Sequence, residues 1–355
     1  MMSKSILSAE TRRLLILVWM GLTIAACSGT GSGYHFWQPS LAASSNEAKA
    51  PEIMHFSKIY YFGYEGLDLK KIEAGMPLKE GAEIAYTQEA LIELMDKINK
   101  AVTAATGKKA TDIAPVFYQQ SWTMYIGLPG TSSHTIKLNA APTEKTELPK
   151  ALMDTYSQTM DANVHALETG LSEDRAIYFR LRESAKEQAK NIGDQLMHVL
   201  AVSSDPMQRR VAAHCLGLVA HTREQVKALA EAGNDQDAAV RNDAVRALGV
   251  MASDNAEAAK YIPAQDMIEL LSSGTWTDRN KGSFVLCGMI KSRDSELIMA
   301  LRRQAIPALK EIAGWDAGHA EPALEILGAI GNIPHDKLFS LIHSEKYQEI
   351  IDSVN

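Results

Sequence analysis

The stretch Asp237-Ala-Ala-Val-Arg-Asn-Asp-Ala-Val-Arg-Ala-Leu-Gly249 predicts the architecture of most of this chain. Val240, Ala244 and Leu248 recur at helical spacing and form one apolar face. Asp237 precedes the run, where its carboxylate can accept hydrogen bonds from the free amides of the first helical turn. A helix of this kind cannot bury its apolar face alone, so we expect further copies that stack against it.

Further copies are present, and each has a glycine at the position of Gly249: Gly217, Gly288 and Gly328. The fifth residue before each glycine is small: Ala212, Ala244, Ser283 and Ala323. Small residues at one level of every copy allow neighbouring helices to approach closely. We also expect each glycine to mark the end of its helix, which is a common position for glycine.

A second helical pattern lies between the copies. Thr222 is a predicted N-cap for one such helix, and Ile262-Pro263 and Ile306-Pro307 open two others. Proline fits the first helical position because the amide it lacks would have no partner there. Each repeat is therefore predicted to be a pair of helices, and stacked pairs form an α-solenoid. Because a repeat contacts only its neighbours, damage to the solenoid is expected to spare the rest of the chain.

Roughly residues 205–352 resemble HEAT repeats of the phycobilisome-lyase-like subtype. The resemblance is carried by the pattern Asp-x-x-Val-Arg-x-x-Ala-x-x-Ala-Leu-Gly, followed by Ile-Pro-Ala-Leu. The resemblance implies an all-α solenoid with a concave protein-binding surface. The third copy departs from this wording at Trp276 and Asn280, and the fourth at Pro322. We therefore treat Trp276 and Trp315 as candidate ligand-facing residues. The alternative is that they cover core exposed between irregular repeats.

The chain begins with the pattern of an export signal. Lys4, Arg12 and Arg13 precede an apolar run that stops at Cys27, and this run is short for a membrane-spanning helix. The adjacent arginines also fit a twin-arginine signal, which directs export in the folded state.

Ile24-Ala-Ala-Cys27 resembles the lipobox of bacterial lipoproteins. The resemblance implies that residues 1–26 are a signal peptide that is removed and that Cys27 accepts the lipid. A plain secretory signal with an incidental cysteine is the alternative. Residues 27–52 are rich in Ser, Gly and Ala, which predicts a flexible tether.

Residues 53–143 predict a small α+β domain. Its expected strands cover 58–62, 113–117, 122–126 and 134–138, and its expected helix begins after Thr87 and ends at Gly107. Residues 144–204 predict a helical connector, and residues 205–355 a solenoid of about four repeats. The predicted fold class is thus an α+β N-terminal domain followed by an all-α HEAT-like solenoid, mostly helical overall.

The polar residues of the α+β domain raise the question of a hydrolase site. The candidates are one aspartate and a group around a predicted turn: Asp112, Ser121, Ser132, Ser133 and His134. A Ser-His-Asp site needs a base that reaches the hydroxyl and an acid that orients the base. The sequence has no nucleophile elbow such as Gly-x-Ser-x-Gly, so we expect a solvated turn and predict no catalytic residue.

We also predict no metal and no cofactor. His214 and His221 are about two helical turns apart, too far to chelate one ion. Cys215 and Cys287 are expected to be small buried core residues without a disulfide.

The leading functional expectation is a membrane-anchored lipoprotein of the bacterial cell envelope, facing the periplasm or the cell surface. It would act as a scaffold or adaptor that binds protein partners through its solenoid. A formal net charge of −7 disfavours nucleic acid as a partner. The alternative is a hydrolase-type envelope enzyme with its site in residues 53–143, whose solenoid recruits partners.

Overall fold

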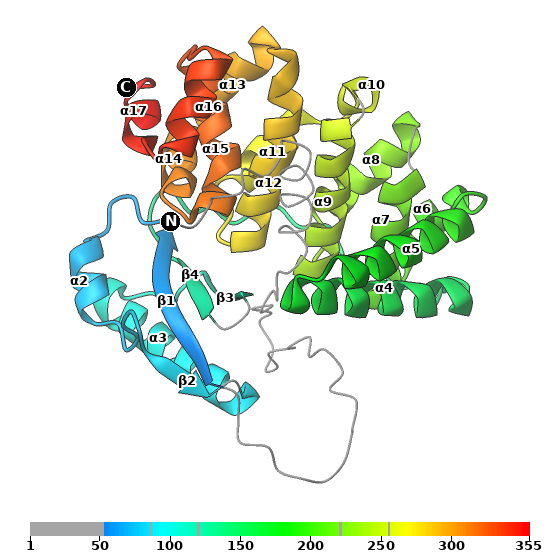
Figure 1. The fold of residues 1–355 in the computed structure, drawn as a ribbon, viewed down its shortest axis with the longest axis horizontal. Coiled ribbons are helices and arrows are strands. Elements are labelled where there is room, and N and C mark those ends of the chain that lie inside the picture. The colour runs from blue at the N-terminus through cyan, green and yellow to red at the C-terminus, as the bar shows by residue number, and fades with distance from the viewer. Residues whose placement is uncertain (1–52, 86, 119–120, 220–221, 255) are drawn as a thin grey trace, which may run out of the picture.

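A small sheet near the start of the chain is followed by a long run of stacked helices (Figure 1). The structure is a computed structural model that describes residues 53–355 except 86, 119–120, 220–221 and 255. It confirms the predicted fold class, an α+β part followed by an all-α, solenoid-like part. The predicted signal peptide, Cys27 and the predicted tether lie outside the described residues.

The sheet has four strands in the order β2-β1-β4-β3. The parallel central pair is β1 (Ile53–Phe62) and β4 (Ser121–Gly127). The antiparallel outer strands are β2 (Glu83–Ala85) and β3 (Asp112–Tyr118). The head, defined here as residues 53–143, also holds α2 (Leu69–Ala74) and α3 (Gln88–Thr106). As predicted, Thr87 caps α3 through its side chain and Gly107 ends it in the left-handed conformation.

The two faces of the sheet belong to different cores. Trp122, Met124 and Ile126 of β4 pack with α3, whereas Tyr125 points to the opposite face and packs with the helices that follow the head. The register of β1 shifts between Phe56 and Ile59, which exchanges the faces to which its later side chains point. The sheet therefore offers an apolar face that its own helices do not cover.

The strand expected at 134–138 is wrong. This segment begins a strap, residues 134–144, that leaves the sheet and crosses the helical repeats in reverse order. The backbone of His134 bonds to Ser272 and Gly274 in the third repeat, and that of Asn139 to Asn234 in the second. Glu144 then bonds to Val202 and Ser204 beside the first repeat, so the strap is held to the repeats at three points where helices end or connect.

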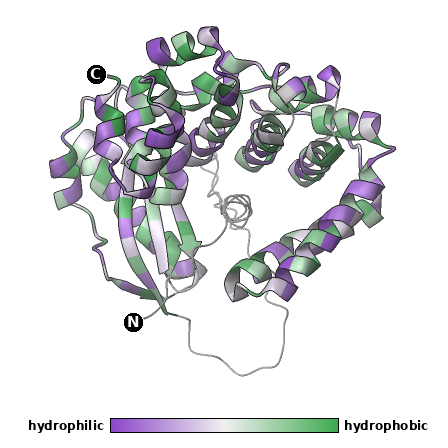
Figure 2. Cartoon of the chain, turned by 45° about the horizontal axis from the view of Figure 1, so that its top comes forward, coloured by the Kyte–Doolittle hydropathy of each residue, from purple (hydrophilic) through white to green (hydrophobic). Residues whose placement is uncertain are grey.

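The strap leads into a connector of three helices and then into the stack. The connector helices are α4 (Lys150–Thr169), α5 (Ser172–Ala189) and α6 (Gly193–Val202). The stack follows in the order α7 (Pro206–Val219), α8 (Arg223–Ala232), α9 (Ala238–Asp254), α10 (Ala256–Ala259), α11 (Ala264–Leu270), α12 (Trp276–Met289), η1 (Ile290–Ser292), α13 (Ser295–Gln304), α14 (Ile306–Ala313), α15 (Ala317–Ile330), α16 (His335–His343) and α17 (Tyr347–Asp352). Each of these helices carries both apolar and polar residues along its length, as expected for helices that bury one face (Figure 2).

The glycines chosen to align the repeats lie inside helices and do not end them. Each marks a place where another helix passes closely. A Cβ at Gly217 would lie 2.5 Å from the Cβ of Ala247, and one at Gly288 would lie 2.8 Å from that of Ala252. The small residues expected one level earlier, such as Ala244, are fully buried. The close-packing role of this pattern is confirmed, and only the helix ends were misplaced.

A ladder of buried arginines links consecutive repeats. Arg209 donates through Nε to Asp235 at 2.7 Å, and Arg241 donates through Nε to Asp278 at 3.0 Å. Asp205 and Asp237 are not the carboxylates that pair with these arginines. Both aspartates instead cap their own helices, accepting from the backbone amides of Met207 and Val240 respectively.

In the third repeat the ladder arginine is Arg279, one residue before the position given by alignment on the glycines. It donates through Nη1 to Glu311 at 2.7 Å. All three ladder arginines also donate to the carbonyl six residues earlier, those of Ser203, Asp235 and Ser273. The helical repeat therefore continues through the third copy, although the sequence pattern of that copy differs from the others.

Candidate functional site

The two tryptophans flagged by the sequence lie between the head and the stack. Trp276 and Trp315 are only 1% and 4% exposed, so neither faces a ligand at the surface. Their rings pack on Tyr125 of β4 at centroid distances of 4.7 and 5.3 Å, and Trp315 also meets Phe62 of β1 at 5.9 Å. The alternative reading is the correct one for both: they cover core, here the core that the head shares with the helices.

A buried carboxylate, Glu311 of α14, holds the same junction together. It pairs with Arg279 and accepts hydrogen bonds from the amides of Gly63 at 2.7 Å and Tyr64 at 3.3 Å. The hydroxyl of Ser132 donates to it at 2.6 Å. The head therefore supplies three of its donors, and every one is far from it in sequence. Because head and stack share a core, we instead expect damage to the stack to reach the head as well.

The candidate catalytic residues of the head have structural partners. Ser132 is buried against Glu311, and Asp112 accepts from the backbone amide of Trp276 at 2.8 Å. His134 contacts the carbonyl of Thr131 through Nε2 at 3.0 Å. No hydrogen bond in the described part of the chain joins His134 to a serine hydroxyl or to Asp112. In this turn Ser132 is buried against the stack, whereas Thr131 and His134 are exposed, as a solvated turn predicts.

The cysteines and histidines occupy different environments. Cys215 is buried, as expected, but Cys287 is only partly buried and borders a groove. Burial lowers the pKa of His214 to about 4, so this imidazole is neutral near pH 7. Among residues 53–355, apart from the gaps noted above, no group of three or more His, Cys, Asp or Glu residues is placed to hold a metal ion. The helices of that same part include none long and apolar enough to cross a membrane.

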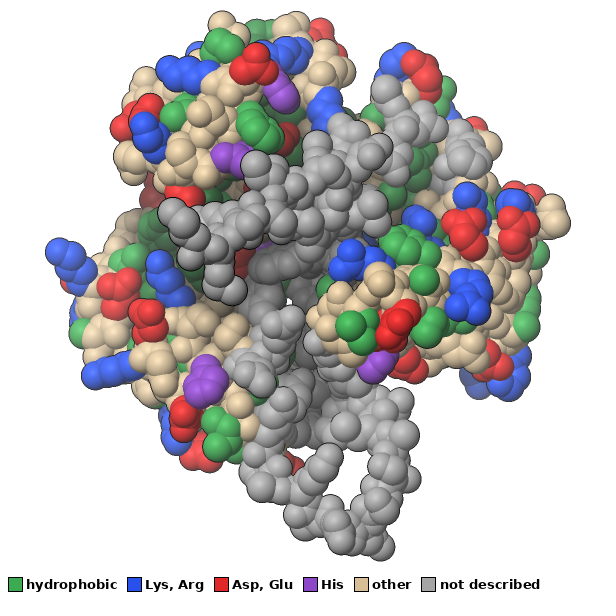
Figure 3. Space-filling model, in the orientation of Figure 1, with side chains coloured by type: hydrophobic (Ala, Val, Ile, Leu, Met, Phe, Trp, Pro, Cys, Tyr) green, Lys and Arg blue, Asp and Glu red, His purple; other side chains and the backbone are tan. Residues whose placement is uncertain are grey.

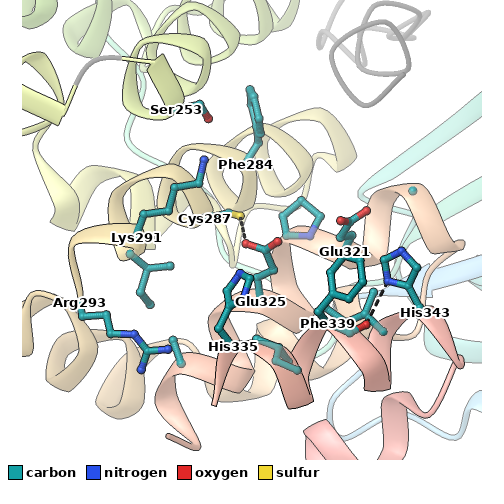
Figure 4. A pocket seen from close by; sticks show the side chains of 16 residues that line it. Ser253, Phe284, Cys287, Lys291, Arg293, Glu321, Glu325, His335, Phe339 and His343 are labelled. Carbon is teal, nitrogen blue, oxygen red and sulfur yellow. Dashed lines mark hydrogen bonds between the residues drawn. The ribbon is translucent and has the colours of Figure 1, made fainter. Parts of the chain in front are cut away.

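The groove is the candidate functional site. It has a volume of about 530 Å³ and lies among α12, α15 and α16, with Ser253 of α9 at its edge (Figure 4). Its walls are largely apolar, formed by Phe284, Pro322, Leu338, Phe339 and Ile342. Phe339 is 55% exposed, the most exposed of the large apolar side chains in the described part of the chain. An exposed aromatic ring beside an apolar hollow is typical of a binding surface.

Charged groups are separated along the groove. Glu321 and Glu325 stand one turn apart on α15 and point into it, while Lys291 and Arg293 lie toward its other end (Figure 4). The thiol of Cys287 donates to Glu325 at 3.1 Å. Burial of the sulfur, and then the neighbouring carboxylates, hold the pKa of that thiol well above its usual range. A thiol that stays protonated is a poor nucleophile, so this site has the chemistry of binding more than of covalent catalysis.

The groove was not predicted from the sequence. Cys287, Glu321 and Phe339 come from three helices, and nothing in their spacing relates them. On the face shown in Figure 3, acidic and basic side chains of the described residues are interspersed, without a broad area of one sign. The sequence matches no family model, and comparison with characterised proteins finds no relative. Assignment of function therefore depends on the geometry of the groove.

Proposed function

We propose that the protein is a lipid-anchored scaffold or adaptor of the bacterial cell envelope that holds a partner protein in the groove among α12, α15 and α16. The observation that carries this proposal is the exposed ring of Phe339 beside an apolar hollow of about 530 Å³. Aromatic anchors next to pockets contribute most of the binding energy in many protein interfaces. Stacked helix pairs commonly use their extended surfaces in this way.

The anchor proposal rests on the sequence alone. Acylation of Cys27, followed by the tether of residues 27–52, would fix the folded part near a membrane surface. Tethering raises the effective concentration of any partner in the same membrane, so that modest affinity in the groove would suffice. The hydrolase alternative has less support, because Ser132 and Asp112 bond to the stack and the His134 side chain contacts the carbonyl of Thr131 in its own turn.

Site-specific photocrosslinking in intact cells tests the scaffold proposal. A photoreactive phenylalanine analogue replaces Phe339 in one strain and Met299 of α13 in another, since Met299 is similarly exposed at 52% but does not line the groove. We expect a discrete protein adduct from position 339 that position 299 does not give. Failure of position 339 to form an adduct, or the same adducts from both positions, would contradict a partner in the groove.

A further inference from the structure

Glu321 and Glu325 form a pair of carboxylates that, in the described part of the chain, makes no ion pair with a basic side chain. They are four residues apart on one helix, where like charges destabilise the helix. Glu321 makes no hydrogen bond or ion pair with any residue in the described part of the chain, and the bond that Glu325 makes is to the neutral thiol of Cys287. Elsewhere this chain places a lysine four residues from an acid on a helix, as in Glu93 with Lys97.

The surroundings of Glu321 make its charge costly. Burial, and then the nearby charge of Glu325, raise the pKa of its carboxyl above the usual range, and His343 opposes this only in part. The ionisable groups of the adjoining elements that share this environment are Cys287, Lys291, Arg293, Glu325, His335, His343 and Tyr347. A cation bound between the two carboxylates would remove the repulsion and favour the ionised form of Glu321.

The groove favours an organic cation over a metal ion. Its walls are largely apolar, and the ring of Phe339, which packs on the imidazole of His343 at a centroid distance of 3.8 Å, remains 55% exposed (Figure 4). A guanidinium can pair with carboxylates through its fork of N–H donors and can also stack on an aromatic face. Arginine is also enriched among the residues that dominate protein interfaces.

We propose that the groove recognises its partner protein through one arginine or lysine side chain that pairs with Glu321 and Glu325, while an adjacent apolar side chain of the same segment packs on Phe339. This inference rests on the proposed function and names the chemistry of the partner. Charge complementarity selects the segment, and the apolar walls exclude water from the pair and strengthen it. Lys291 and Arg293 at the other end would disfavour a segment with further basic residues on that side.

The first test uses a defined probe on the purified full-length protein. Phenethylguanidinium carries a ring and a guanidinium, phenethyl alcohol has the ring without charge, and phenylpropionate has the ring with a negative charge. We expect the guanidinium probe to bind most tightly by NMR titration, with release of protons near the pKa of Glu321. The double variant Glu321→Gln/Glu325→Gln should weaken it about tenfold or more, as loss of one charged contact typically does.

A matched control removes the same charge elsewhere. Glu183→Gln/Glu187→Gln deletes two carboxylates four residues apart on α5, far from the groove, and should leave probe binding unchanged. Phe339→Ala should weaken the guanidinium and the alcohol probes alike. Equal binding of the charged and neutral probes, or no effect of the groove double variant, would overturn the inference.

The second test separates this inference from the proposed function. The groove double variant is combined with the photoreactive residue at position 339, and the cellular adduct is expected to be lost. An adduct that persists at full yield would overturn the cationic contact while leaving the scaffold proposal standing. Charge-dependent probe binding without any protein adduct would overturn the assignment to a protein segment together with the scaffold proposal.

Discussion

The carboxylate of Asp112 in strand β3 accepts a hydrogen bond from the backbone amide of Trp276 at 2.8 Å, and so caps a helix that begins 164 residues further along the chain. In the first and second repeats the corresponding cap is local, from Asp205 and Asp237. In the third repeat Thr275 occupies the N-cap position and makes no side-chain cap. The head therefore completes the repeat on which it docks.

Removal of this cap should destabilise the protein in a pH-dependent way. Burial raises the pKa of Asp112 to about 7, whereas an unfolded aspartate titrates near 4. Between about pH 4 and pH 7 the folded state therefore binds the extra proton, and stability is lost as the pH rises through this window. The side chain of Asp112→Asn cannot ionise, so this variant should show a smaller loss of unfolding free energy between pH 5 and pH 8 in urea titrations.

Asp112→Ala removes the cap itself and should cost about 1–2 kcal/mol of unfolding free energy at pH 5. Identical pH profiles for wild type and Asp112→Asn would contradict this assignment.

Loss of the Glu311 carboxylate should be among the most damaging single changes. Glu311→Ala leaves the guanidinium of Arg279 buried without its partner and removes the acceptor for the Gly63 amide. Breaking a buried pair from one side costs about 3–5 kcal/mol. Glu349→Ala is the control, because its carboxylate pairs with Lys346 at the surface and should change stability by no more than about 0.5 kcal/mol. Similar urea midpoints for the two variants would mean that the junction does not depend on Glu311.

Truncation in the helical core should affect the head as well. Leu248 of α9 is fully buried, and Leu248→Ala is expected to cost roughly 2–5 kcal/mol. Because head and stack share a core, amides of β4 and α9 should lose protection against hydrogen exchange together. Leu138→Ala, at a side chain that is 41% exposed, should have a much smaller effect. Persistent protection of β4 while α9 exchanges would show that the two parts unfold separately.

A methyl group at Gly217 should separate α7 from α9. The added Cβ would lie 2.5 Å from the Cβ of Ala247 and 3.2 Å from its Cα, and the backbone cannot yield easily. Overpacking of this kind costs about 1–3 kcal/mol, which thermal denaturation can measure. In Gly193→Ala the nearest atom is the flexible side-chain end of Gln225 at 3.0 Å, so that variant should be within about 1 kcal/mol of wild type. Equal melting temperatures would contradict the close approach at Gly217.

The anchor proposal makes a prediction about Cys27. Cys27→Ala should leave an uncleaved precursor or release protein from the membrane fraction, because the lipid acceptor is lost. Ser28→Ala changes the next residue without removing the thiol and should fractionate as wild type does. Cell fractionation with mass measurement of the mature chain distinguishes them. Normal processing and equal membrane retention of Cys27→Ala would exclude a lipid on this cysteine.

Local patterns predicted most of the elements correctly. The caps at Thr87 and Thr222, the helix opened by Ile306-Pro307 and the strands around Ile113 and Trp122 are where the sequence placed them. These features depend on residues a few positions apart, so spacing alone identifies them. The segment at 134–138 was misassigned because its hydrogen-bond partners lie in the loops of distant repeats.

By itself the sequence determined the stack. Apolar positions at helical spacing, with small residues at one level of each copy, require helices that bury one face against their neighbours, whatever surrounds them. Tertiary structure alone decided what the irregular positions do. Trp276, Arg279 and Asp112 acquire their roles only because the open face of a sheet docks on the third repeat, and the groove beside Phe339 exists only where three helices meet. Contacts between residues far apart along the chain leave no periodic pattern in the sequence, because they depend on the path of the whole chain.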